Sequence, residues 1–225
     1  LNHLAGELHK PGGSELPACW ISGFFGSGKS SFAKLLGYAL DGRCLPDGKS
    51  LAQALLERND SPRQAEFRQA WERLTGGLKA MAVVFDIGAA ARDDEHIHSA
   101  IRRKLQARLG YCESSSAVAE FELKLEGDGH WPRLLELTQS LLQRPWSQVV
   151  KEKLVEEHFS RLMAELMPAH YDHPMAWLDQ HSGFSRSRDA SVDETVADIA
   201  AMLKRRAEDA TVFLVVDEVS QYIYQ

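Results

Sequence analysis

The stretch Gly23-Phe24-Phe25-Gly26-Ser27-Gly28-Lys29-Ser30, followed by Ser31, constrains this chain more than any other feature. It has the phosphate-loop pattern, in which Gly-Lys-Ser follows a glycine and four further residues. Glycines let a backbone wrap closely around an anion, while successive N–H groups and the positive end of the following helix point at it. The pattern predicts that residues 23–31 hold nucleotide phosphates, that Lys29 stabilises the γ-phosphate and that Ser30 binds Mg²⁺.

The segments on both sides of the loop fit this interpretation. Residues 16–22 end in a short apolar run that suits a buried parallel strand. After the loop, apolar side chains recur at helical spacing from near Gly28 to before Gly42: Phe32, Leu35, Leu36, Ala39 and Leu40. The alternative is a glycine-rich turn without a ligand, but such a turn has no reason to place Lys29 and Ser30 in this register.

A second motif stands near the end of the sequence. Residues 211–216 form a strongly hydrophobic run that delivers Asp217 and Glu218 at its carboxyl end. Ligands bind at that end of parallel strands, where an acidic residue holds Mg²⁺ and an adjacent glutamate polarises the attacking water. We therefore expect Asp217 to coordinate the metal and Glu218 to be the general base. The alternative is a core strand that ends in two surface acids. It is disfavoured because each motif predicts the other.

These motifs predict the fold class, an α/β P-loop NTPase core built as a three-layer sandwich. Strands are expected near 17–22, 81–87 and 211–217, with helices on both faces of the sheet. A glutamate directly after the acidic residue is typical of the class with an additional strand between the two motif strands. We expect the remaining strands, with a sensor residue and an arginine finger, beyond Gln225, because the chain begins at Leu1 rather than Met and stops amid patterned sequence.

The rest of the chain is patterned as helices. Helices are expected at 51–58 and, after an N-terminal cap at 60–62, up to about residue 74. They are then expected throughout a long region at 97–109, 117–125, 131–142, 147–167 and 192–206. The chain thus divides into the first part of the core at 1–92, a helical insertion at 93–206 and the second motif strand at 207–225. Connections between core elements usually take ~4–6 residues, so an insertion of this length is expected to serve as a partner surface.

Two side-chain clusters in the insertion have alternative interpretations. One is basic and either contacts a nucleic acid or partner or, as we favour, is the solvated face of an amphipathic helix: Arg102, Arg103, Lys104 and Arg108. The other suggests a metal site but lacks recognised ligand spacing, so a loop of exposed histidines is favoured: His96, His98, His170, Asp172, His173, Asp179 and His181.

Composition narrows the class of protein. The net charge of −6 argues against a whole-surface nucleic-acid binder. The cysteines lack CxxC spacing, which favours a reducing compartment and no zinc cluster: Cys19, Cys44 and Cys112. No apolar run approaches the ~20 residues of a membrane span and no charged-then-apolar leader opens the chain, so we expect a cytoplasmic protein without membrane contact.

Three stretches together resemble the N-terminal ATPase region of the BrxC (PglY) proteins of BREX bacteriophage-defence systems. They are the loop region at 20–40, the strand at 83–87 and the tail at 213–223. The Gly-Phe-Phe-Gly form of the loop and the Asp-Glu-Val-x-Gln-Tyr tail are more specific than general nucleotide motifs. The helical middle agrees only in layout, and Ser220 stands where many relatives have Gly.

The resemblance implies a large, multidomain and homo-oligomeric ATPase that uses ATP and Mg²⁺. It would act with a methyltransferase and other BREX components to mark host DNA and block phage replication, while direct contact with DNA is not indicated by the residues. The alternative is a nucleotide-dependent scaffold or signalling switch with little turnover. Glu218 favours hydrolysis, because a pure binding module has no need of a base there.

Overall fold

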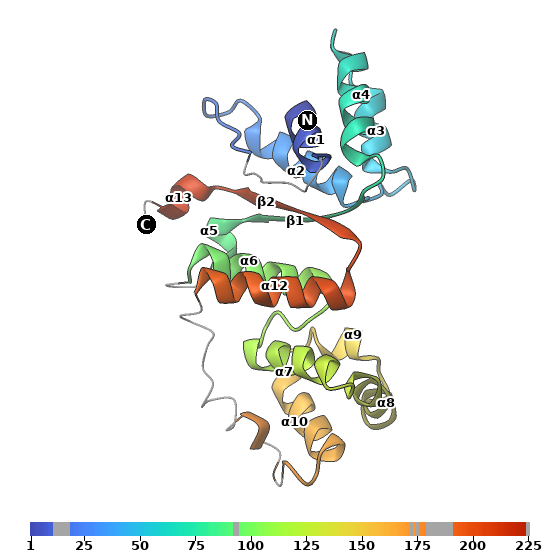
Figure 1. The fold of residues 1–225 in the computed structure, drawn as a ribbon, viewed down its shortest axis with the longest axis vertical. Coiled ribbons are helices and arrows are strands. Elements are labelled where there is room, and N and C mark those ends of the chain that lie inside the picture. Colours follow the sequence, from blue (N-terminus) through green and yellow to red (C-terminus); the bar gives the residue numbers. More distant parts are fainter. Residues whose placement is uncertain (11–18, 92–94, 172, 174–175, 179–190, 224–225) are drawn as a thin grey trace. The chain divides into compact units, whose positions relative to one another are not determined.

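The computed structural model describes residues 1–10, 19–91, 95–171, 173, 176–178 and 191–223 (Figure 1). The chain divides into two compact units, which we call the core unit (Leu1–Ala90 with Asp209–Gln225) and the helical unit (Ala91–Glu208). The expected division placed the helical insertion at 93–206, close to these bounds.

The core unit contains a two-stranded parallel sheet. Strand β1 (Lys79–Asp86) pairs with β2 (Ala210–Asp217) in an unbroken register from Lys79↔Ala210 to Asp86↔Asp217. Both strands are runs of apolar and β-branched residues, as suits a sheet with a buried face. The strands expected at 81–87 and 211–217 are therefore confirmed, and both end in an aspartate at the same edge of the sheet.

The strand expected near 17–22 is not formed in its described part. Residues 17 and 18 lie outside the described residues, and residues 19–22 are non-regular, with the Trp20 side chain 71% exposed. A strand needs a neighbour to accept its backbone hydrogen bonds, and the two strands of the described sheet pair with each other. A three-layer sandwich is thus not evident in the described residues, and the fold class stays a prediction.

Four helices of the core unit lie together on one face of this sheet: α1 (Asn2–Leu8), α2 (Lys29–Leu40), α3 (Leu51–Arg58) and α4 (Gln64–Thr75) (Figure 1). Helix α2 packs directly on the strands, because Gly37 has no side chain between it and Val84 and Val215. Their shared core is apolar and includes Leu40, Trp71, Leu74 and Ala82. Helix α4 begins at Gln64, shortly after the cap predicted at 60–62, but a turn occupies 61–63 and no side chain caps the helix.

Two short helices follow the strands at the carboxyl edge of the sheet. Helix α5 (Ile87–Ala90) comes directly after β1 and α13 (Val219–Ile223) comes after β2, and the two are in contact. Parallel strands direct both connections to the same edge. That edge therefore carries Asp86, Asp217 and Glu218 together.

The described residues of the helical unit contain helices and no strand. Its main helices are α6 (Ile97–Leu109), α7 (Ser116–Gly127), α8 (Trp131–Leu142), α9 (Trp146–Val149), α10 (Val155–Leu166) and α12 (Val192–Arg206). The core is aromatic and centred on Phe159 and Trp177, whose rings meet edge-to-face at 4.8 Å. The predicted helices are confirmed except one, because the segment predicted as a single helix at 147–167 is interrupted.

The interruption separates α9 from α10. Lys151 and Glu152 donate their backbone N–H groups to carbonyls three residues earlier, which is turn geometry rather than α-helix. The Glu152 carboxylate pairs with Arg144 and lies 3.2 Å from His158 Nε2. These contacts hold the turn, and apolar periodicity cannot reveal them because the spacing continues across it.

The basic cluster of α6 is a solvated face only in part. Arg102 is 7% exposed and donates to Asp198 of α12 at 2.6 Å, and Arg103 donates to Glu95 at 2.7 Å. About two helical turns further on, Arg206 Nη1 of α12 donates to the Leu109 carbonyl of α6 at 3.1 Å. Because both partners advance together along the sequence, α6 and α12 run parallel. The favoured interpretation was therefore wrong for Arg102, which joins the two helices, whereas Arg108 is exposed.

A carboxylate is buried in the helical unit. Glu122 has no exposed surface, accepts from Cys112 N and from Trp146 Nε1, each at 2.7 Å, and lies 3.9 Å from Arg206 Nη2. Burial raises the pKa of Glu122 to about 7, although these donors and the Arg206 charge act in the opposite direction. The group therefore titrates near neutral pH.

Candidate nucleotide site

The glycine-rich loop is folded back on itself in front of α2. Gly26 and Gly28 have φ of 79° and 85°, the left-handed region that glycine enters without steric cost. Ser27 N donates to the Phe24 carbonyl at 3.2 Å, which closes the turn. A Cβ at Gly23 would lie 3.0 Å from Ser27 Oγ, so the backbone there approaches the turn closely. The three glycines of the motif therefore each serve the loop conformation.

Lys29 begins α2 and extends its side chain over this loop. Its Nζ donates to the Phe24 carbonyl at 2.9 Å. The ammonium is exposed, so this bond to a loop carbonyl competes with water and is readily exchanged for a stronger, charged acceptor. Phe24 and Phe25 lie at the tip of the loop with 91% and 105% of their surface exposed. Ser31 follows in the first turn of α2 and is also exposed.

The two sequence motifs meet at Ser30 and Asp217. Ser30 Oγ donates to Asp217 Oδ1 at 3.0 Å, although the residues are 187 positions apart in the sequence. Ser30 is placed by the start of α2, and Asp217 by the last position of β2. A hydroxyl and a carboxylate are oxygen ligands of the kind that Mg²⁺ takes. The pair therefore has the chemistry and the proximity that the sequence predicted for the metal ligands.

Lys34 is a member of this site that the sequence reasoning missed. Its Nζ lies 3.0 Å from Asp217 Oδ2. Burial raises the pKa of Asp217, but hydrogen bonds from Lys34 and Ser30 outweigh it, so the pKa lies below its ordinary value. The hydrogen bond to Asp217 in turn raises the pKa of Lys34. The sequence signal that could have identified Lys34 was its spacing from Ser30. Lys34 follows Ser30 by four residues, and residues four apart on a helix share a face.

Asp86 is a second member that was not assigned a role. It is the register partner of Asp217 on β1, and its Oδ1 accepts from Ala89 N at 3.2 Å. The negative charge of Asp86 also acts on Lys34 and helps to raise the pKa of that lysine. The sequence signal was the repetition of an aspartate after each of the two buried runs.

Glu218 follows Asp217 in an unusual backbone conformation. Its φ of 58° lies in the left-handed region, which residues other than glycine rarely adopt. Its backbone carbonyl accepts from Tyr222 N at 3.3 Å at the start of α13. A backbone outlier of this kind costs free energy and persists only where surrounding structure imposes it. The residue predicted as the general base is therefore held at the sheet edge, half-buried, by a strained turn.

The described part of the chain bears on the suggested histidine metal site and on the expectation of no membrane span. Asp172, Asp179 and His181 lie outside the described residues, and His96 and His98 stack on each other with ring centroids 5.4 Å apart. Within the residues described, no group of three or more His, Cys, Asp or Glu side chains is placed to hold a metal ion. None of the described helices has the length and apolar character that crossing a membrane requires.

No protein-family model fits the chain, and no solved structure matches it. The functional interpretation therefore depends on the geometry at the carboxyl edge of β1 and β2.

Proposed function

We propose that the chain binds ATP between the loop at 23–31 and the carboxyl ends of β1 and β2, and that it hydrolyses the nucleotide. The observation that carries this proposal is the hydrogen bond from Ser30 Oγ to Asp217 Oδ1. Each residue was selected from its own motif for the same metal ion. A chance glycine-rich turn and a chance acidic strand end have no reason to meet.

The loop supplies the phosphate contacts. Its positive-φ glycines let the backbone wrap closely around an anion, and α2 begins directly behind them with its positive end at the loop. Lys29 exchanges the Phe24 carbonyl for the β- and γ-phosphates and stabilises the charge that develops on the transferred group.

Ser30 and Asp217 are the residues that would hold Mg²⁺. The ion, when bound, neutralises charge on the β- and γ-phosphates. Hydrogen bonds from Lys34 and Ser30 hold the pKa of Asp217 below its ordinary value despite burial, which favours the ionised state that a metal ligand needs. Asp86 adds negative charge at the same edge and favours a cation there.

Glu218 is proposed as the general base that orients and polarises the attacking water. It is one residue beyond Asp217, at the mouth of the same strand. The strained turn at Glu218 fixes where its side chain leaves the backbone. A positioned base of this kind commonly contributes ~10² to 10⁴ in rate.

The class with an additional strand accounts for the loop region. In that class another strand lies between the two motif strands, so residues 19–22 are not expected to pair with β2 directly. This agrees with their non-regular conformation and with the exposed Trp20 and Ile21 side chains. The proposal therefore predicts a further strand along the free edge of β2.

The specific biological role is proposed from the resemblance alone. It is that of a cytoplasmic, homo-oligomeric BrxC-like ATPase that acts with other BREX components in defence against phage and in host DNA methylation. The helical unit would serve as the surface for a partner. It is a separately packed unit with its own aromatic core, as a dedicated module requires.

The test compares Lys29→Ala with Lys10→Ala, a control that removes an exposed lysine paired with Glu7. Calorimetric titration with Mg²⁺ and a non-hydrolysable ATP analogue measures affinity, and phosphate release measures turnover. Lys29→Ala is expected to weaken binding and abolish hydrolysis, while Lys10→Ala matches the parent. Unaltered binding and turnover in Lys29→Ala would refute the assignment. Tight binding by the parent without phosphate release would instead favour the nucleotide-dependent scaffold.

A further inference from the structure

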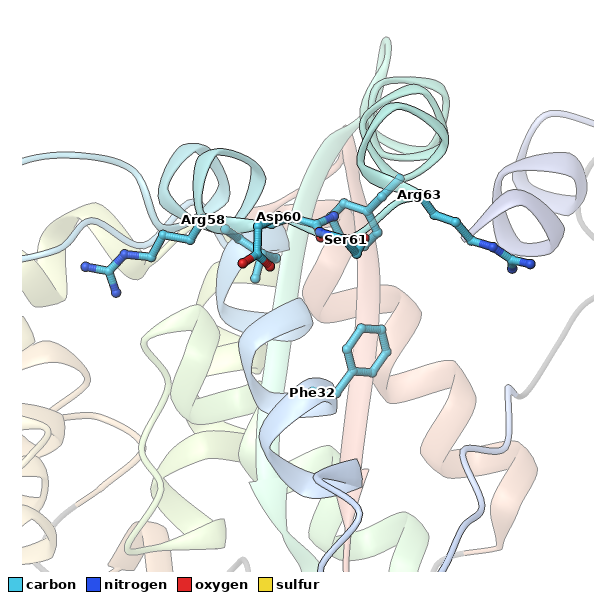
Figure 2. A pocket seen from close by; sticks show the side chains of 8 residues that line it. Phe32, Arg58, Asp60, Ser61 and Arg63 are labelled. Carbon is cyan, nitrogen blue, oxygen red and sulfur yellow. The ribbon is translucent and has the colours of Figure 1, made fainter.

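A pocket of about 450 Å³ opens beside α2 in the core unit. It lies between the first turns of α2 and the connection from α3 to α4 (Figure 2). Three of its lining residues are apolar: Phe32, Leu55 and Phe67. Nothing derived so far uses these side chains.

The polar groups of the pocket come from the connection between α3 and α4. Figure 2 shows the Phe32 ring pointing from α2 toward the turn that carries Asp60 and Ser61, while the side chains of Arg58 and Arg63 extend away on opposite sides. The interior therefore combines an aromatic face with a short polar turn, and the two guanidinium groups stay outside it.

The polar turn offers both an acceptor and a donor. Asn59 Oδ1 accepts from Ser61 N at 3.2 Å, which fixes the amide and leaves its nitrogen as the donating side. The Asp60 carboxylate only accepts when ionised. A ligand for this pocket is thus a flat, apolar-faced group with a hydrogen-bond donor and an acceptor on one edge.

The pocket is within reach of the phosphate loop. Phe32 follows Lys29 by three residues on α2, a rise of ~4.5 Å along the helix axis. The Phe32 N–H also donates to the carbonyl of Gly28 at 2.9 Å, so the backbone of Phe32 is joined to the last glycine of the loop. A nucleotide whose phosphates occupy the loop extends past the first turn of α2 toward this ring.

We propose that this pocket binds the adenine base of that nucleotide, with the base stacked on Phe32; the proposal rests on the proposed function. Adenine carries an amino donor and a ring-nitrogen acceptor on one edge, which match Asp60 and Asn59. In the same pose, guanine would set its carbonyl oxygen against the Asp60 carboxylate and its ring N–H against the donating side of Asn59. In this pose the pocket selects adenine over guanine nucleotides.

The experiment measures the affinity of the full chain for three probes, each with Mg²⁺: ATP, GTP and inorganic tripolyphosphate. The variants are Phe32→Ala, Asp60→Asn and Lys29→Ala. Leu35→Ala is the matched control, because Leu35 is a 40% exposed residue of the same helix and does not line the pocket. Phe32 is itself 45% exposed, so its truncation leaves the fold intact.

Phe32→Ala is expected to weaken ATP about tenfold to a hundredfold, the usual range for loss of base stacking. The same variant binds tripolyphosphate as the parent does, and Asp60→Asn narrows the preference for ATP over GTP. Leu35→Ala leaves all three affinities unchanged.

Two outcomes separate failure of the pocket from failure of the proposed function. If Lys29→Ala weakens ATP while Phe32→Ala leaves ATP affinity unchanged, or weakens ATP and tripolyphosphate equally, the base pocket is overturned and the phosphate site stands. If the parent binds neither ATP nor tripolyphosphate, both fall together.

Discussion

Lys34 Nζ lies 3.0 Å from Asp217 Oδ2, on the opposite side of the carboxylate from the hydroxyl of Ser30. Both oxygens of the proposed metal ligand are therefore already engaged by groups from one face of α2. A cation that binds Asp217 meets a resident ammonium, and the two positive charges compete for the same carboxylate.

The first prediction follows from this competition. Lys34→Met is expected to lower the Mg²⁺ concentration needed for half-maximal ATP binding about twofold to fivefold, the scale of a partly exposed ion pair. Mg²⁺ titrations at fixed ATP provide the measurement, with Lys10→Met as a control whose ion pair to Glu7 involves none of the motif residues. A higher Mg²⁺ requirement in Lys34→Met would show instead that Lys34 orients the carboxylate for the metal.

The second prediction concerns the contact between α2 and the sheet. A Cβ at Gly37 would lie 2.5 Å from Val84 Cγ2 and 3.0 Å from Val215 Cγ2. Gly37→Ala is therefore expected to lower the free energy of unfolding by about 1–3 kcal/mol through overpacking. Gly6→Ala is the control, since Gly6 is also helical and has nothing within 4 Å of its added Cβ. Denaturant unfolding of both variants tests the difference, and equal stability would mean that α2 shifts freely on the strands.

The third prediction separates the chemical from the conformational role of Glu218. Glu218→Gln keeps the side-chain size and removes the charge that polarises water, so hydrolysis should fall ~10² to 10⁴ while ATP affinity is retained. Single-turnover hydrolysis beside equilibrium binding is the measurement. Parent-like hydrolysis would place the base elsewhere, and loss of binding would give Glu218 a structural or metal role.

Glu218→Gly completes this comparison. Because φ at Glu218 is 58°, glycine relieves backbone strain and should raise the free energy of unfolding by up to about 1 kcal/mol, while hydrolysis is lost. Glu218→Gln keeps the strain and should match the parent in stability. A glycine variant less stable than the glutamine variant would show that no strain is stored at this turn.

The fourth prediction concerns pH and the helical unit. The folded-state pKa of Glu122 is about 7, above its ordinary value of 4.5, so the folded unit binds the proton more tightly. Its stabilising contribution is complete below pH 4.5 and is lost as the pH rises through about 7. The shift corresponds to a fall in the free energy of unfolding on the order of 3 kcal/mol as the pH rises.

The variants for this test are Glu122→Gln and, as control, Glu136→Gln at an exposed salt bridge with Arg133. Denaturant unfolding monitored by the buried Trp146 and Trp177 measures stability between pH 5 and 8. Glu122→Gln should flatten the pH dependence, because an amide does not titrate, while Glu136→Gln keeps it. If the stability of Glu122→Gln depended on pH as steeply as that of the parent, groups other than Glu122 would cause the pH dependence.

Much of the core unit was predictable because local pattern and position determine it. The start of α2 was found from the loop motif, and β1 and β2 from continuous apolar runs. The strand expected near 17–22 failed in its described part for a non-local reason. A strand forms only where a neighbouring strand pairs with its backbone. An apolar run such as that around Trp20 and Ile21 is compatible with a strand but does not specify that neighbour.

Local sequence pattern was also insufficient to predict all side chains of the site. Ser30 and Asp217 were found because motifs name them, whereas Lys34 and Asp86 belong to no motif and are recruited by the packing of α2 on the strand ends. Arg102 was misjudged because its partner Asp198 lies on a helix far along the chain. Charge partners of this kind are decided by tertiary structure, which helical periodicity does not encode.

The connectivity of the sheet has a consequence for the order of folding. The chain leaves β1 at its carboxyl end and, after the whole of the helical unit, enters β2 at its amino end. Pairing the strands before that unit forms would close a very long flexible loop, at a cost in chain entropy that grows with loop length. The helical unit is built from contacts between its own residues, such as the parallel pair of α6 and α12. Formation of that unit first would shorten the loop, so we expect the sheet edge that carries Asp86 and Asp217 to assemble late in folding.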